Sequence, residues 1–239
     1  MKFLKGIKAI FLKDLICELR RYEILPATIV LAILIGWVFR LSLSSSLSNA
    51  ATATAVIIVS SLFATILLSN KSFATEFSNG CIEALIMSPM DAGSLYLSKF
   101  LVNFVMLLIF QLFSVPVVCV LFGLNPIGKV FQLICVMLIM NGAFSSGATL
   151  LAAAMQESRG QNSLLSVVLM ALLSPVIIPL IFVFFSVFNY KPEAMELNSV
   201  VSAVGSFGRA VGFIISFDAI FITASWLLFD FVVHEQEKL

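Results

Sequence analysis

The sequence predicts an all-α polytopic integral membrane protein with six transmembrane helices. Three observations predict this class. Of the 239 residues, 61% are apolar and only 11% are charged, whereas soluble chains are usually about 45–50% apolar and about 25% charged. The charges also divide the chain into long uncharged runs, and a bilayer core of about 30 Å needs about 20 helical residues. This composition excludes a disordered chain and argues against a soluble enzyme.

Residues 2–23 are expected to form an amphipathic helix that lies in the membrane interface and does not cross it. On a helical wheel one arc holds the cations Lys2, Lys5, Lys13 and Arg20. The largely opposite arc holds Phe3, Ile7, Ile10, Phe11 and Leu15. Asp14 and Glu18 interrupt the apolar arc, so we expect this face to be imperfect.

The uncharged runs predict spans at residues 25–44, 50–70, 100–123, 129–155, 163–188 and 209–231. All six are expected to be helices, because lipid offers no hydrogen-bond partner to an unpaired backbone. Pro175 and Pro179 predict a kink or a break in the fifth span. No repeat or composition shift divides the chain, so residues 1–239 are expected to form a single transmembrane domain.

The distribution of Lys and Arg predicts the orientation. Six spans place both termini on one side of the membrane. Of the 14 Lys and Arg residues, that side holds Lys2, Lys5, Lys8, Lys13, Arg20, Arg21, Lys71, Lys99, Arg159 and Lys238. The other side holds Arg40, Lys129, Lys191 and Arg209. Because cytoplasmic loops carry the excess of Lys and Arg, both termini are expected in the cytoplasm.

No catalytic or metal-binding constellation is evident in the sequence. Residues 123–130 come close to a nucleotide-binding phosphate loop, but Val130 replaces the required Ser or Thr and no strand precedes the loop. A turn between the third and fourth spans is the expected structure. His234 is the only histidine, so we expect no metal site and no enzyme activity. A net charge of +1 without a basic cluster indicates no nucleic-acid partner.

Asp218 is the unusual residue of the sixth span, because a charge near the middle of a bilayer costs a few kcal/mol or more unless it is paired, protonated or hydrated. Two interpretations stand side by side. In the first, Asp218 lines a pathway or couples motion. In the second, it forms a hydrogen bond between helices with one of the other polar residues in the spans, Asn103, Gln111 or Asn141.

The cytoplasmic segment 71–99 carries the most informative pattern. Gly80 precedes three apolar residues that share one face of a short helix, namely Ile82, Leu85 and Ile86. Glu83 lies near the start of that helix, where the dipole favours an anion. Ser88-Pro89 ends it, and Asp91 begins the next helix. Such a helix could dock into the groove of a soluble partner, although a plain solvated loop is also compatible with the composition.

This segment, after the second of six spans, looks like the coupling helix of exporter-type ABC permeases. The chain as a whole resembles the heme exporter protein B (CcmB) family, the permease subunit of bacterial cytochrome c maturation. The resemblance is carried in order by Lys-Asp-Leu at 13–15 with residues 18–23, by residues 70–91 and 96–99, by Gly142 to Leu150 with Arg159 and residues 175–179, and by residues 217–221 and 226–232.

The resemblance implies a permease that works with a separate ABC ATPase in two copies, a second copy of itself, a haem-handling membrane subunit and a small single-span subunit. ATP and magnesium would bind the ATPase, haem would be cargo of the pathway, and this chain would bind no cofactor. The location implied is the bacterial inner membrane. The residues implied in ATPase coupling are Glu76, Gly80, Ile82, Glu83, Leu85, Ile86, Ser88, Pro89 and Asp91. Motion of this segment would rearrange spans two, three and five.

Two other functions remain compatible with the sequence. An ABC export permease for a lipid, glycan or drug would share the coupling helix, and the identity of its ATPase would distinguish it. A membrane assembly subunit that transports nothing would leave ATP hydrolysis by its partner unchanged.

Overall fold

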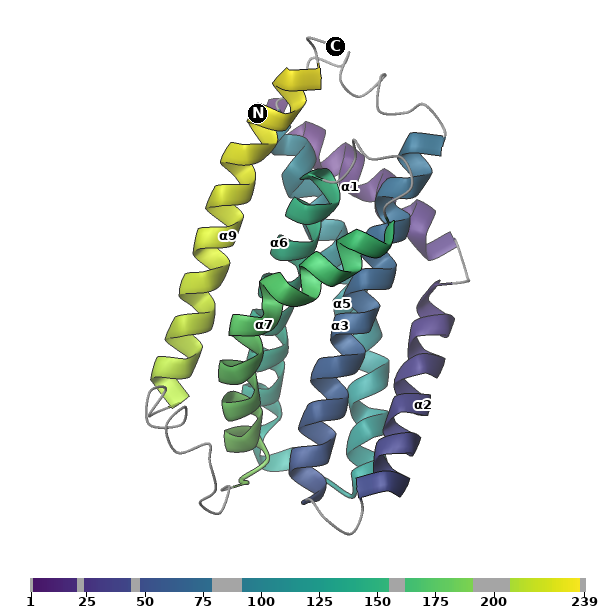
Figure 1. Cartoon of the computed structure of the whole chain (residues 1–239), viewed down its shortest axis with the longest axis vertical. Coiled ribbons are helices and arrows are strands. Elements are labelled where there is room, and N and C mark those ends of the chain that lie inside the picture. Colours follow the sequence, from purple (N-terminus) through teal and green to yellow (C-terminus); the bar gives the residue numbers. More distant parts are fainter. Residues whose placement is uncertain are drawn as a thin grey trace.

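The computed structural model describes residues 2–20, 24–43, 48–78, 92–154, 162–190 and 207–236. Within these ranges all regular structure is helical, which confirms the all-α class (Figure 1). The helices are α1 (Lys2–Arg20), α2 (Ile24–Leu43), α3 (Asn49–Ser78), α5 (Ala92–Phe122), η1 (Ile127–Lys129), α6 (Val130–Ala154), α7 (Asn162–Val187) and α9 (Phe207–Gln236).

Six of these helices are long and apolar enough to cross a membrane, as the sequence predicts. Their apolar parts are Leu25–Leu43, Asn49–Ser69, Tyr96–Phe122, Val130–Leu151, Ser166–Val187 and Phe207–Leu227. The helices differ from the predicted spans chiefly in length. The α3 helix continues to Ser78, and α5 begins at Ala92. Neither extension contains proline, and Asn79-Gly80 is the first helix-breaking pair after α3.

The spans form one bundle in which α3 and α6 are central. In their apolar windows 72% and 67% of the residues are buried, compared with 17% in both α2 and α9. The core contains large side chains that are fully buried, among them Phe110, Met140, Phe144 and Phe184. The outer helices therefore present most of their apolar surface away from the bundle, as expected for side chains that contact lipid.

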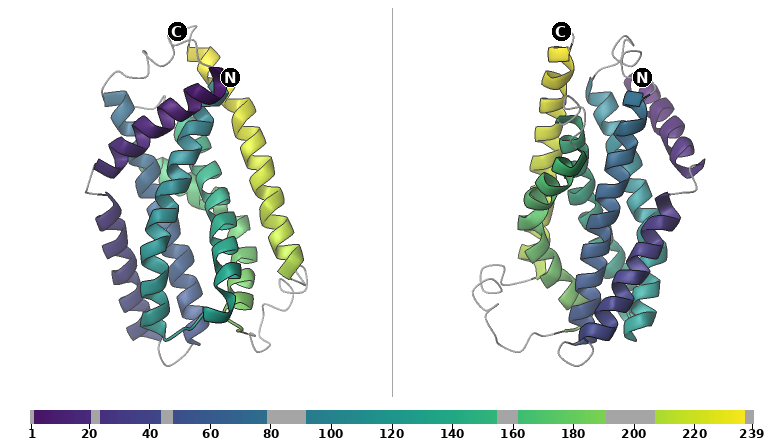
Figure 2. Two further views of the ribbon diagram at one scale, coloured as in Figure 1. Left: turned by 180° about the vertical axis from the view of Figure 1, so that it is seen from behind. Right: turned by 45° about the vertical axis from the view of Figure 1, so that its right-hand side comes forward.

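Both termini lie at one end of the bundle, which is consistent with an even number of spans (Figure 1). At this end α1 crosses the outside of α5 obliquely, as the rear view in Figure 2 shows. Asp14 and Glu18 are buried, with 6% and 8% of their surface exposed, on the same side of α1 as the buried Ile10 and the partly buried Phe11 and Leu15. They interrupt this apolar side, as the wheel predicts, and the side packs on the bundle.

The opposite end of the bundle contains the turn expected at residues 123–130. Gly123 adopts φ +66° after the last residue of α5. The amide of Leu124 donates to the carbonyl of Cys119 at 2.8 Å, which satisfies a carbonyl at the helix end. The short helix η1 then leads into α6. These residues therefore form a helix-ending turn, as predicted from the missing features of a phosphate loop.

Lys129, at the end of this turn, forms hydrogen bonds at the C-terminal end of α7. Its ammonium group donates to the carbonyl of Ser186 at 2.6 Å and to the side-chain oxygen of Asn189 at 2.5 Å. Asn189 has φ +55°, and the amide of Tyr190 donates to the carbonyl of Phe185 at 2.9 Å. A cation at a helix C-terminus interacts favourably with the helix dipole. The role of Lys129 visible in the structure is therefore the capping of α7.

The α7 helix is continuous through Pro175 and Pro179, but its ribbon bends partway along (Figure 1). A proline within a helix removes one backbone hydrogen bond and its ring displaces the preceding turn. The sequence prediction of a kink is thus confirmed, and the helix does not break.

Candidate functional site

The residues proposed for ATPase coupling lie mostly outside the described part of the chain. This applies to Gly80, Ile82, Glu83, Leu85, Ile86, Ser88, Pro89 and Asp91. Glu76 falls within the last turns of α3. The structure does describe the end of the segment 71–99, which forms the first turns of α5 from Ala92 onward. The contacts of its first turns show which elements a movement of the segment would reach first.

Three residues at the start of α5 contact three other elements. We call Gly93, Tyr96 and Lys99 the α5 junction. Gly93 is buried against α9, because the indole of Trp226 occupies the place where a side chain on this glycine would begin. Tyr96 is 1% exposed, and its hydroxyl faces the side chains of Thr149 in α6 and Ser225 in α9. The junction therefore joins α5 to α6 and α9.

Lys99 joins the same turns of α5 to α1. Its ammonium nitrogen lies 2.8 Å from Oδ2 of Asp14, and both side chains are buried, with 3% and 8% of their surface exposed. Lys13 lies 3.3 Å from Oδ1 of the same carboxylate, but its side chain is 53% exposed. Breaking a buried ion pair by removing one partner is strongly destabilising. The Asp14–Lys99 pair thus holds α1 to α5.

A second group of polar side chains lies in the middle of the bundle. The side-chain amide of Gln111 in α5 donates to the side-chain oxygen of Asn141 in α6 at 2.7 Å. It also lies 3.4 Å from the hydroxyl of Ser61 in α3. All three residues are at most 1% exposed. This bonding joins the central helices α3 and α6 through α5, and so brings together two of the four predicted intramembrane residues.

Asp218 does not form the predicted hydrogen bond with Asn103, Gln111 or Asn141. Its Oδ1 is buried without a hydrogen-bond partner among the described residues. The carboxylate instead lies against Gly142, where a Cβ atom would be 2.6 Å from Oδ2. Asn103 is also buried, and its side-chain nitrogen has no partner in the described part of the chain. Gln111 and Asn141 bond to each other, and each keeps one side-chain atom without a partner among the described residues, Oε1 and Nδ2 respectively.

Asp218 and Tyr96 both lie beside α6 and α9. On α6, Gly142 contacts Asp218 and Thr149 faces Tyr96; on α9, Ser225, which also faces Tyr96, follows Asp218. On both helices the two positions are seven residues apart. Seven residues are two helical turns, or about 10 Å. The contact between α6 and α9 therefore connects the α5 junction with Asp218 in the middle of the span.

Sequence reasoning placed Tyr96, Lys99 and Gly142 in the stretches that carry the family resemblance, but it named none of them, and not Gly93, as a site residue. One signal was available, because Tyr96 and Lys99 are three residues apart and therefore share a face at the start of an apolar helix. Nothing in the local sequence indicates that Gly93 would lie against Trp226, more than 130 residues away.

The fold and the polar groups define a class: a multi-pass helical membrane protein with buried polar contacts between its spans. The chain belongs to the CcmB protein family, whose model matches residues 5–220. No curated protein and no solved structure matches the chain. The family is that of the permease subunit, the membrane component of the haem-export ABC transporter of cytochrome c maturation, and it works with an ABC ATPase.

Proposed function

We propose that this chain couples ATP hydrolysis on a separate ABC ATPase to rearrangement of its own spans, in haem export or release of the haem chaperone for cytochrome c maturation. The family membership supports the process. The α5 junction supports the coupling role, because it follows the predicted coupling helix of residues 80–88 and contacts three further elements. The proposal places the chain in the bacterial inner membrane, with both termini in the cytoplasm.

In this proposal residues 71–99 receive the movement of the ATPase. Gly93, Tyr96 and Lys99 lie at the end of this segment, in the first turns of α5, so a displacement of the segment would move them directly. The contacts of these residues favour α9, α6 and α1 as the first elements to move. The expectation from the sequence is that spans two, three and five rearrange. Span five is α7, which packs on α3, α6 and α9. It is therefore not among the elements that the α5 junction contacts directly.

The partners are proposed from the family. Two ATPase copies would hold ATP and magnesium, and two permease copies would pair in the membrane. A haem-handling membrane subunit and a small single-span subunit would complete the assembly. Haem would be cargo of the pathway, and this chain would hold no cofactor.

The process is tested in a strain that lacks the chain, with and without the chain restored from a plasmid. Haem staining of membrane and periplasmic c-type cytochromes is the readout. We expect covalent haem to disappear and to return on complementation. Unchanged covalent haem, in a strain with no second copy of the gene, would refute the process and indicate a different cargo.

The coupling role is tested by substitution of Glu83 and Leu85 with alanine. We expect the inserted double variant to retain less ATPase in co-purification, because the apolar face and the anion of the predicted helix are removed. Met87→Ala is the matched control, because the predicted helix would place Met87 away from the face that Ile82, Leu85 and Ile86 share. Normal ATPase recovery with a stable, inserted Glu83→Ala/Leu85→Ala variant would contradict the coupling assignment.

A further inference from the structure

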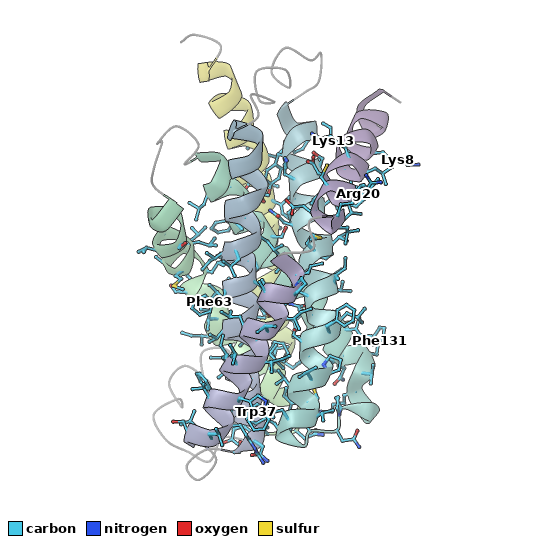
Figure 3. The ribbon with its side chains drawn as sticks, turned by 90° about the vertical axis from the view of Figure 1, so that its right-hand side faces the viewer. Lys8, Lys13, Arg20, Trp37, Phe63 and Phe131 are labelled. Carbon is cyan, nitrogen blue, oxygen red and sulfur yellow. The ribbon has the colours of Figure 1, made fainter. Side chains whose placement is uncertain are left out.

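The side of α1 that faces away from α5 combines apolar and basic residues. Leu12, Ile16 and Leu19 are 43%, 48% and 41% exposed. Their spacing of four and three residues makes one stripe along the helix. Lys8 and Arg20 are exposed, and the Lys13 side chain is 53% exposed. We call these six residues the outer face of α1; Figure 3 labels its three cations.

The ion pair with α5 fixes the depth of this face. Lys99 lies three residues inside the apolar part of α5, which begins at Tyr96. Three residues of helix correspond to about 4.5 Å. Because Asp14 lies 2.8 Å from Lys99, α1 lies beside the first turn of the span and not beyond its end. Figure 2 shows α1 on the flank of the bundle at this level.

At this depth the outer face adjoins the boundary between acyl chains and headgroups. Three exposed apolar residues of other helices, Phe63, Trp37 and Phe131, lie further along the bundle, as Figure 3 shows. A helix with an apolar stripe bordered by cations binds such a boundary through apolar burial and attraction to anionic lipids. The stripe and its cations match that description.

The acidic residues of α1 are directed away from this boundary. Asp14 and Glu18 are both buried, and Asp14 is paired with Lys99. Among the side chains of α1 that the structure describes, the exposed charged groups are therefore cations. The wheel predicts that the acids and the cations lie on different arcs, and the packing on α5 shows that the arc with the acids is the buried one. The packing on α5 leaves a surface whose charge complements an anionic headgroup.

We propose that the outer face of α1 binds the headgroups of anionic phospholipids in the leaflet that adjoins the α5 junction. Lys8, Lys13 and Arg20 contact the phosphates, and Leu12, Ile16 and Leu19 contact the acyl chains below them. This lipid selectivity goes beyond the proposed function and does not depend on it, because it requires neither an ATPase nor haem.

The experiment uses the full chain in lipid nanodiscs with a fluorophore on Cys17, which is exposed on α1. The other three cysteines are replaced by alanine or serine. Phosphatidylglycerol or phosphatidylcholine with brominated acyl chains is included at the same mole fraction, and quenching of the fluorophore is compared. We expect at least about three-fold greater quenching by the anionic lipid at low salt. The ratio of quenching by phosphatidylglycerol to quenching by phosphatidylcholine should fall towards one at about 0.5 M salt, where charges are strongly screened.

Two variants separate charge from other effects. Lys8→Gln/Lys13→Gln/Arg20→Gln should abolish the preference. Lys8→Arg/Lys13→Arg/Arg20→Lys keeps the charge and should retain it. If the glutamine variant fails to insert, the salt series on the chain with its native cations decides the question. Equal quenching by the two lipids at low salt would overturn the proposal, and so would a preference that salt does not reduce.

Discussion

The indole of Trp226 in α9 lies where a side chain at Gly93 of α5 would begin, so any larger residue at this position would force the indole to move. Gly93 is the second residue of α5, at the end of the predicted coupling segment 71–99. The contact is therefore the most direct path by which movement of that segment would reach the sixth span.

We expect Gly93→Ala to displace this indole. Since the chain has two tryptophans, a Trp37→Phe background makes Trp226 the only emitter. Its emission maximum and its quenching by acrylamide should both change. The loss of stability should be about 1 kcal/mol, at the low end of the range for overpacking, because Trp226 is 52% exposed and can turn outward.

Gly128→Ala is the control for that substitution, because no atom lies within 4 Å of a Cβ placed there. It should leave the fluorescence of Trp226 unchanged. A Gly93→Ala variant with unaltered emission and quenching would show that the two helices do not pack as described.

Gly142→Ala should destabilise the contact between α6 and α9, because its Cβ would lie 2.6 Å from Oδ2 of Asp218. Overpacking of a buried site costs about 1–3 kcal/mol. Unfolding in detergent titrations measures the cost. In the Gly142→Ala/Asp218→Ala double variant the alanine at 142 should cost less than it does alone, since contacting residues are not additive. Gly212→Ala, which meets open space, is the control, and strict additivity would argue against the contact.

Lys99→Met should destabilise the protein far more than Lys13→Met, although both lysines lie near Asp14. Removing one partner of a buried ion pair costs about 3–5 kcal/mol, whereas an exposed pair contributes at most about 1 kcal/mol. Thermal unfolding and proteolysis within α1 provide the measurements. Exchange of the charges in Asp14→Lys/Lys99→Asp should recover part of the loss. Equal effects of the two methionine substitutions would contradict a buried pair.

Gln111→Leu should cost about 1–2 kcal/mol, because it leaves the side-chain oxygen of Asn141 without its partner in an apolar interior. The Gln111→Leu/Asn141→Leu double variant should be closer to the unsubstituted chain, since replacing both partners removes the unsatisfied group. Unfolding midpoints of the two variants and of Asn141→Leu test this order. A double variant that is less stable than either single variant would indicate a further role for the pair.

Several features could be predicted from the sequence because they depend on local composition. Each span is a long uncharged run, and lipid leaves such a run no alternative to a helix. The turn at residues 123–130 and the bend in α7 follow from glycine and proline, whose backbone restrictions are local. The family could be recognised because its motifs follow one another along the chain.

The candidate sites were less predictable. Asp218, Gln111 and Asn141 could be singled out, since polar residues in apolar spans are conspicuous. Their partners could not, because Asp218 lies against Gly142 while Gln111 and Asn141 bond to each other. The wheel of α1 likewise could not show that Asp14 faces Lys99, a residue 85 positions further along the chain.

The composition and the order of the apolar runs were thus sufficient for the class of protein, the number of spans and the family. Both properties can be read directly from the sequence, and the membrane requires every long apolar run to be a helix. The pairing of buried polar groups depends on how the helices rotate and approach one another. Gly93 and Gly142 matter because side chains of α9 lie where their own side chains would begin. The exposed side of α1 is positively charged because its acidic residues are buried against α5.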